Sequence, residues 1–131
     1  MTQHVILSTD SQIQPGKVRQ LEKLLERLLQ HIQRTEPGTL YYGWFIDEKL
    51  ERCHVIQHYM DGDALLFHLH NYKPFAAELN SLRKVERVVC CGSIPEGLVD
   101  GFNTAGVDMF EMEVGSFVSD TLTQNTSMSL H

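Results

Sequence analysis

The sequence contains few of the residues that would indicate a disulfide-rich, secreted or membrane protein. It has three cysteines in 131 residues, and two of them are adjacent, which makes a poor disulfide framework. No apolar run approaches the ~20 residues that span a bilayer. The segment MTQHVILSTD lacks the basic and apolar regions of a secretory signal. We therefore expect a cytoplasmic protein.

Positive charge is also scarce. Lysine and arginine total 11 against 17 acidic residues, giving a net charge of −6. The only basic cluster is Arg83, Lys84 and Arg87, and Glu78 and Glu86 lie beside it. Binding to a nucleic-acid backbone requires many unopposed cations, so no nucleic-acid partner is expected.

The chain does contain the residue pattern of one α+β domain. Hydrophobic residues make up 42% and charged residues 21%, which is ordinary for a globular protein. The length suits a single hydrophobic core. We expect one domain over residues 1–118 and a polar, disordered tail over residues 119–131.

The first half of the chain alternates between strand and helix patterns. Residues 4–9, 39–46 and 51–60 are rich in β-branched and aromatic residues, and an acidic turn joins the last two segments as a hairpin. Between the first two strands, apolar residues recur three and four positions apart. This spacing predicts a helix over residues 15–34, which the Pro37-Gly38 pair ends.

The second half repeats the alternation less regularly. Asp61 or Asp63 can cap a helix over residues 64–71, which Pro74 breaks before a short helical segment at 75–82. Strands follow at 85–94 and 108–117, separated by a loop with about one helical turn. The order β-α-β-β-α-β-β predicts an α+β, ferredoxin-like antiparallel sheet with helices on one face. The hairpin is apolar on both sides. The helices cover one of its faces, so the other face needs a partner subunit to cover it.

Four of the seven histidines lie between residues 54 and 70, at two spacings that resemble metal-ligand pairs. His54 and His58 fall on a predicted strand, where their Cα atoms are roughly 13 Å apart. One ion cannot reach both, because zinc–nitrogen bonds are only ~2.0–2.1 Å long. His68 and His70 fall on a predicted helix, where they point roughly 160° apart. The sequence therefore predicts no metal site.

A site without metal remains open for three of these histidines. His68 flanks the apolar arc of its helix and should point between helix and sheet. His54 and His58 alternate with Ile56 on one strand face, and all three histidines line one cavity if that face looks toward the helices. The alternative is that they are half-buried and bond to backbone or water, and His70 is expected at the surface.

The segment EPGTLYYGWFIDEKLERCHVIQHYMDGDALLFHLHN, residues 36–71, resembles the antibiotic biosynthesis monooxygenase-like family of dimeric α+β barrels. The shared features are the Glu-Pro-Gly-Thr start of the second strand, the acidic turn and a third strand ending in Tyr59. An acidic cap, the His68-Leu69 pair and a downstream Phe75 follow. With the preceding strand and helix, the resemblance covers about residues 4–118.

The resemblance implies a homodimer whose sheets pack face to face, and oxidation of a small phenol, quinol or other aromatic by O2 without a cofactor. Such a reaction needs a base, hydrogen bonds to the anion and exclusion of water. His68 occupies the position of the family's helix histidine and would be the base or a hydrogen-bond donor. Asn71 would orient a substrate oxygen, and Trp44, Tyr42 and Tyr59 would form aromatic walls.

Two departures from the family pattern favour other functions. Lys73-Pro74 stands where relatives often have a second histidine, and Gln57 stands where many have a glutamate. A non-catalytic binding or sensing module of the same fold is therefore the alternative, and haem binding or degradation is a third. Trp44, Tyr42 and Tyr59 can also be explained as core or dimer-interface residues.

Overall fold

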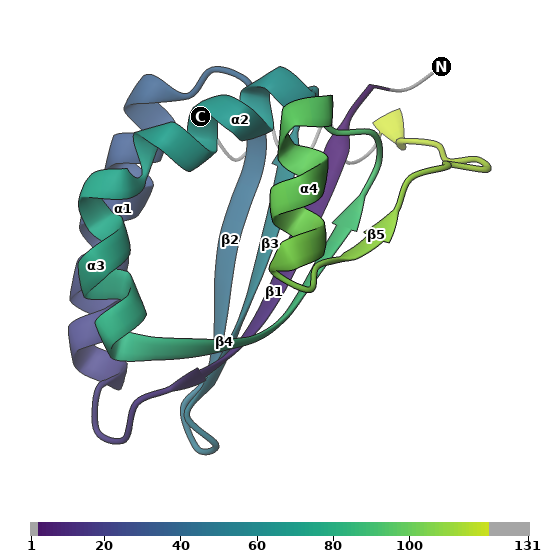
Figure 1. Ribbon diagram of the computed structural model, residues 1–131. Coiled ribbons are helices and arrows are strands. Elements are labelled where there is room, and N and C mark those ends of the chain that lie inside the picture. Colours follow the sequence, from purple (N-terminus) through teal and green to yellow (C-terminus); the bar gives the residue numbers. More distant parts are fainter. Residues whose placement is uncertain (1–2, 121–131) are drawn as a thin grey trace.

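The computed structural model describes residues 3–120, and its elements follow the predicted order with one helix added (Figure 1). The tail predicted at 119–131 lies, apart from its first two residues, outside the described residues. The elements are β1 (Val5–Ile13), α1 (Val18–Thr35), β2 (Thr39–Asp47), β3 (Arg52–Tyr59), α2 (Gly62–Asn71), α3 (Lys73–Leu82), β4 (Arg83–Cys91), α4 (Glu96–Thr104) and β5 (Asp108–Phe110).

The strands form one five-stranded sheet in the order β2-β3-β1-β4-β5. The first four strands pair antiparallel, which confirms the ferredoxin-like prediction. The last strand differs from the prediction, because β5 has three residues and runs parallel to β4. A helix between the two strands explains the direction, since a parallel pair needs a crossover connection.

That crossover is α4, where the sequence predicted a loop with about one helical turn. Leu98 and Phe102 pack against the core from this helix. Their helical spacing is obscured by Gly97 and Gly101, which are poor helix formers. Packing on the sheet outweighs that local preference.

All four helices cover one face of the sheet (Figure 1). The alternate residues of β1 that face the helices, from Val5 to Ile13, are all buried. Helices α1 and α3 pack over one end of this face, and α2 and α4 pack over the other. None of the helices within residues 3–120 is long and apolar enough to cross a membrane.

The opposite face of the sheet is open to solvent and carries large apolar side chains. Its exposed hydrophobic residues, which are between 36% and 52% accessible, are Ile6, Tyr41, Phe45 and Ile56. The hairpin is therefore apolar on both sides, as the sequence indicated.

Helix α1 shows how directly apolar spacing is converted into burial. Its buried residues are Val18, Leu21, Leu24, Leu25, Leu28 and Ile32. Leu28 is fully buried, whereas its neighbour Leu29 is 37% exposed. Leucine is therefore buried at one position of α1 and exposed at the next.

Leu28→Ala should lower the free energy of unfolding by about 2–5 kcal/mol, because it removes buried methyl groups and leaves a cavity. Leu29→Ala, the matched control, should change it by roughly 0.5 kcal/mol or less. Urea denaturation followed by circular dichroism measures both values. Equal losses in the two variants would contradict the burial pattern of α1.

Candidate functional site

A cavity of about 210 Å³ lies between the helix-covered face of the sheet and the helices. Most of its lining is apolar, and the polar side chains among the lining residues are few. The cavity is lined by Leu7, Thr9, Tyr42, Trp44, Val55, Gln57, His68, Leu69, Tyr72, Leu79, Arg83, Val85, Val88, Phe102, Ala105 and Val107. Mostly apolar cavities with a few polar groups are typical small-molecule sites.

His68 lines this cavity from α2 and is paired with a carboxylate. Its Nδ1 lies 3.0 and 3.1 Å from the two carboxylate oxygens of Glu36. His68 is 3% exposed and Glu36 is 4% exposed. Because an ionised carboxylate only accepts hydrogen bonds, the Nδ1–H of His68 must donate. In the neutral imidazole, Nε2 then carries the free lone pair and can accept a proton.

Glu36 is held as an anion by three converging donors. Burial alone would raise the pKa of its carboxyl group, but hydrogen bonds from His68, Thr39 and Asn71 outweigh burial and lower the pKa below its ordinary value. The Thr39 hydroxyl donates to Oε1 over 2.6 Å, and the Asn71 amide donates to Oε2 over 2.8 Å. The pair can therefore stabilise positive charge on the imidazole.

Aromatic rings fix the orientation of the His68 ring. The Tyr72 ring stacks on it with centroids 5.3 Å apart and an interplanar angle of 6°. The rings of Tyr42 and Tyr59 tilt against it at 5.2 and 5.4 Å. Burial raises the pKa of both of these tyrosines above the ordinary value, so both hydroxyls stay neutral. The Tyr59 hydroxyl donates to Oε1 of Gln57.

The predicted aromatic walls are only partly in place. Tyr42 and Trp44 line the cavity from β2. Tyr59 does not line the cavity, because it is fully buried behind His68 and Gln57. Its role is to support the ring of His68.

Asn71 does not reach the cavity, contrary to the predicted role in orienting a substrate oxygen. Its amide nitrogen donates to the Thr35 hydroxyl and to Glu36, both over 2.8 Å. Its amide oxygen accepts from Nε2 of His31 over 3.1 Å. These bonds occupy the amide on both sides, so Asn71 positions the carboxylate of Glu36 instead.

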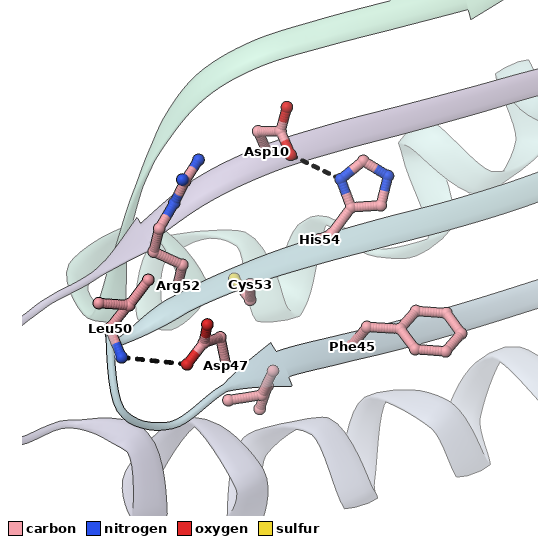
Figure 2. A pocket seen from close by; sticks show the side chains of 8 residues that line it. Asp10, Phe45, Asp47, Leu50, Arg52, Cys53 and His54 are labelled. Atoms are coloured by element: carbon pink, nitrogen blue, oxygen red, sulfur yellow. Dashed lines mark hydrogen bonds and ion pairs between the residues drawn. The ribbon is translucent and has the colours of Figure 1, made fainter.

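His54 and His58 lie on the other face of the sheet, so they do not share a cavity with His68. The residues of β3 that face the helices are the alternate set Cys53, Val55, Gln57 and Tyr59. His54 donates to Asp10 on the neighbouring strand over 2.6 Å, beside an open depression of about 380 Å³ (Figure 2). His58 lies 2.7 Å from Nδ1 of His4.

The histidine spacings have the geometry expected from the sequence. His54 and His58 lie on a strand, and His68 and His70 lie on a helix. Within residues 3–120, no three His, Cys, Asp or Glu side chains gather in a way that could hold a metal ion.

Two residues of the site were not identified from the sequence as functional, Glu36 and Arg83. Glu36 caps the C-terminal end of α1, where the helix dipole disfavours negative charge. A carboxylate at such a helix end needs donors from elsewhere in the fold. This position is the only indication in the sequence that Glu36 has a special role. In the sequence, Arg83 is only part of a basic cluster. The face of the sheet toward which its side chain points depends on an irregularity in β4.

Glu36→Gln should lower the free energy of unfolding by about 1–3 kcal/mol at pH 7, because it removes the anion that accepts three hydrogen bonds. The folded pKa of Glu36 lies below its ordinary 4.5. Its contribution is therefore complete above pH 4.5 and is lost as the pH falls through the folded value. The difference from wild type, measured by urea denaturation, should shrink below pH 4.5.

Glu26→Gln is the matched control, since Glu26 is an exposed residue of the same helix. It should shift stability by roughly 0.5 kcal/mol or less at every pH. A Glu36→Gln difference that stays constant from pH 6 to pH 3 would contradict a lowered pKa.

Comparison with known proteins connects this site to a family. The family model described as antibiotic biosynthesis monooxygenase matches residues 5–73. No curated protein matches the sequence. The match covers more than half of the chain and includes both Glu36 and His68.

Solved structures share the fold over 71–93% of this chain. MupZ from Pseudomonas fluorescens is 21% identical, with a TM-score of 0.77 over 93% of this chain and 94% of that one. SnoaB from Streptomyces nogalater, described as a cofactor-independent oxygenase, is 18% identical, with a TM-score of 0.61 over 72% and 96%. Rv0793 from Mycobacterium tuberculosis is 21% identical, with a TM-score of 0.58 over 71% and 97%. At these identities the likeness shows the fold alone.

The family match, together with this fold, confirms the resemblance in residues 36–71: the chain belongs to the antibiotic biosynthesis monooxygenase family, within the dimeric α+β barrel superfamily.

Proposed function

We propose that the protein is a cofactor-independent monooxygenase that oxidises a small phenol or quinol with O2, with His68 as the general base. The observation that carries this proposal is the buried pair of His68 and Glu36 at the wall of a mostly apolar cavity. Glu36 occupies Nδ1 of the imidazole, which leaves Nε2 for a substrate proton. A base oriented by a carboxylate is a common arrangement for proton transfer in enzymes.

The chemistry needs little from the protein beyond this base. His68 removes the phenolic proton, and Glu36 stabilises the imidazolium that forms. The electron-rich phenolate then passes an electron to O2, and the two radicals combine at a ring carbon. Overall, a phenol and O2 give a quinone and water, so the substrate itself supplies all the electrons. Water is excluded by the apolar lining, which protects the charged intermediates.

The alternative function is a binding or sensing module of the same fold. Gln57 favours it, because a neutral amide stands in the cavity where many relatives carry a carboxylate. That amide also has its oxygen engaged by the Tyr59 hydroxyl. A binder, however, has no need for a base oriented by a buried anion.

His68→Gln should lower oxygen uptake at least ~100-fold on any phenol or hydroquinone that wild-type protein oxidises, because general-base catalysis contributes a factor of this order. An oxygen electrode measures uptake by chelator-treated protein across a panel of such compounds. His70→Gln is the matched control on the same helix, since His70 is exposed and should retain full activity.

Three outcomes separate the candidates. Uptake that resists the chelator and is lost only in His68→Gln supports the oxygenase. Equal activity in His68→Gln and wild type excludes His68 as the base. No uptake above buffer on any compound favours the binding module.

We also propose that the protein is a homodimer formed through the open face of the sheet. Ile6, Tyr41, Phe45 and Ile56 form the apolar part of this face. An exposed apolar patch on a sheet face is characteristic of a protein–protein interface. The hydrogen bond between His54 and Asp10 lies in the same surface and would be partly enclosed by the partner.

Light scattering should give a mass near twice the 15.0 kDa of one chain. Ile56→Asp should shift the mass toward that of the monomer, because it places a charge at the middle of the apolar face. Phe67→Asp, at an exposed residue of α2 on the helix-covered side of the sheet, is the matched control and should stay dimeric. A wild-type mass near 15 kDa would contradict the proposal.

A further inference from the structure

Arg83 reaches the cavity because of an irregularity in β4. The register between β1 and β4 shifts at Asp10 and Ser11, so that Asp10 faces Arg87 while Ser11 faces Val85. The extra residue is a β-bulge, which turns the following side chains to the other face. Arg83 pairs with Ile13, a fully buried residue of the helix-covered face. Without the bulge, alternation from Cys90 would direct Lys84 inward and Arg83 outward.

The guanidinium of Arg83 has only neutral neighbours. It lies 5.3 Å from the centroid of the Trp44 ring, and its Nη1 donates to the Ser11 hydroxyl over 3.3 Å. In the described part of the chain, no carboxylate lies within ion-pair distance of it. Burial lowers the pKa of Arg83, in agreement with the lack of an ion-pair partner. Arginine stays protonated even so, because its ordinary pKa lies far above neutral pH.

Two buried hydrogen-bond donors lack acceptors at the end of the cavity where Arg83 lies. Nε of Arg83 and the indole Nε1 of Trp44 are the only buried side-chain nitrogens or oxygens within residues 3–120 that make no hydrogen bond. The indole N–H lies close enough to the Tyr42 hydroxyl to act toward lowering the pKa of that hydroxyl, but burial has the larger effect and raises it. No hydrogen bond forms from the indole N–H. Unsatisfied buried donors are rare and costly, and they are often explained by a missing ligand or ion.

We propose that Arg83 and Trp44 form an anion-binding subsite, so that the cavity takes a substrate with a carboxylate or a similar small anionic group. The proposal rests on the cavity being the substrate site, as proposed above, but does not depend on the O2 reaction. A carboxylate at Arg83 would neutralise its charge and accept from Nε. A small shift of the Arg83 side chain would open Nε and the Trp44 indole N–H to the ligand oxygen.

The subsite and the base lie at different ends of one aromatic wall. His68 contacts the Tyr42 ring at 5.2 Å, the Tyr42 and Trp44 rings are 6.5 Å apart, and Arg83 lies over Trp44. A flat molecule along this wall would place its anionic group at Arg83 and its acidic hydroxyl toward His68. The structure thus favours a hydroxylated aromatic acid over a simple phenol.

Isothermal titration calorimetry with two matched pairs of probes tests the subsite. The pairs are 4-hydroxybenzoate with 4-hydroxybenzamide, and hexanoate with hexanamide, so that within each pair a charged carboxylate is replaced by a neutral amide of similar size. Wild-type protein should bind each carboxylate at least roughly tenfold more tightly than its amide, the size of one charge-assisted hydrogen bond. Trp44 is the only tryptophan of the chain, so the transparent hexanoate should also change the intrinsic fluorescence.

Variants distinguish the subsite from general charge effects. Arg83→Gln should abolish the preference for carboxylates, and Arg83→Lys should keep part of it, because lysine retains the charge but not the planar donors. Lys84→Gln removes a positive charge from the adjacent exposed residue and should leave the preference intact. Circular dichroism melting confirms that each variant is folded.

The outcomes also separate this proposal from the oxygenase. A carboxylate preference that survives in Arg83→Gln, or is absent in wild type, overturns the subsite even if phenols are oxidised. A preference lost in Arg83→Gln but kept in His68→Gln supports the subsite even if no compound consumes O2.

Discussion

The carboxylate of Glu36 is the group around which the site is organised. An anion inside a protein is strongly unfavourable unless hydrogen bonds replace its water. The three donors that do so come from β2 and α2, through Thr39, His68 and Asn71. Because Glu36 itself ends α1, this one group joins two helices and a strand. The geometry of His68 is therefore coupled to the packing of the whole domain.

This network also explains why the helix carries two polar residues three positions apart. His68 and Asn71 both point from α2 toward the end of α1, but only His68 lines the cavity. Asn71 joins His31 and Thr35 of α1 to the same carboxylate. His68 thus faces the cavity, while Asn71 fixes Glu36, the partner of His68. Their spacing in the sequence does not distinguish these two roles.

The sequence allowed most of the fold to be predicted, because apolar periodicity is local. The 3.6-residue repeat of α1 and the hairpin of β2 and β3 appeared where expected, and so did His68 on the inner side of α2. The sequence does not indicate which face of β3 points toward the helices, since Ile56 on one side and Val55 on the other are equally apolar. That ambiguity is the reason why His54 and His58 were expected in the cavity. Helix α4 was missed because two glycines weaken its pattern.

The remaining parts of the site depend on contacts between residues distant in sequence. Glu36 meets His68 across 32 positions, and no local pattern connects them. Arg83 faces inward only because a bulge shifts the register of β4 by one residue. A one-residue shift reverses every side chain beyond it, so simple alternation predicts the wrong face. Placing Arg83 requires the pairing of β4 with β1, and placing Glu36 requires the packing of α2 against the end of α1.

The two internal charges together favour proton transfer in one direction. Glu36 is negative behind His68, and Arg83 is positive at the other end of the wall formed by Tyr42 and Trp44. In a cavity of low polarity, such charges act more strongly than they would in water. Their field would draw a proton toward His68 and stabilise negative charge left on a substrate that extends toward Arg83. Burying an arginine without an ion-pair partner in so small a domain lowers its stability, but the charge prepares the cavity for the separation of charge that deprotonation would require.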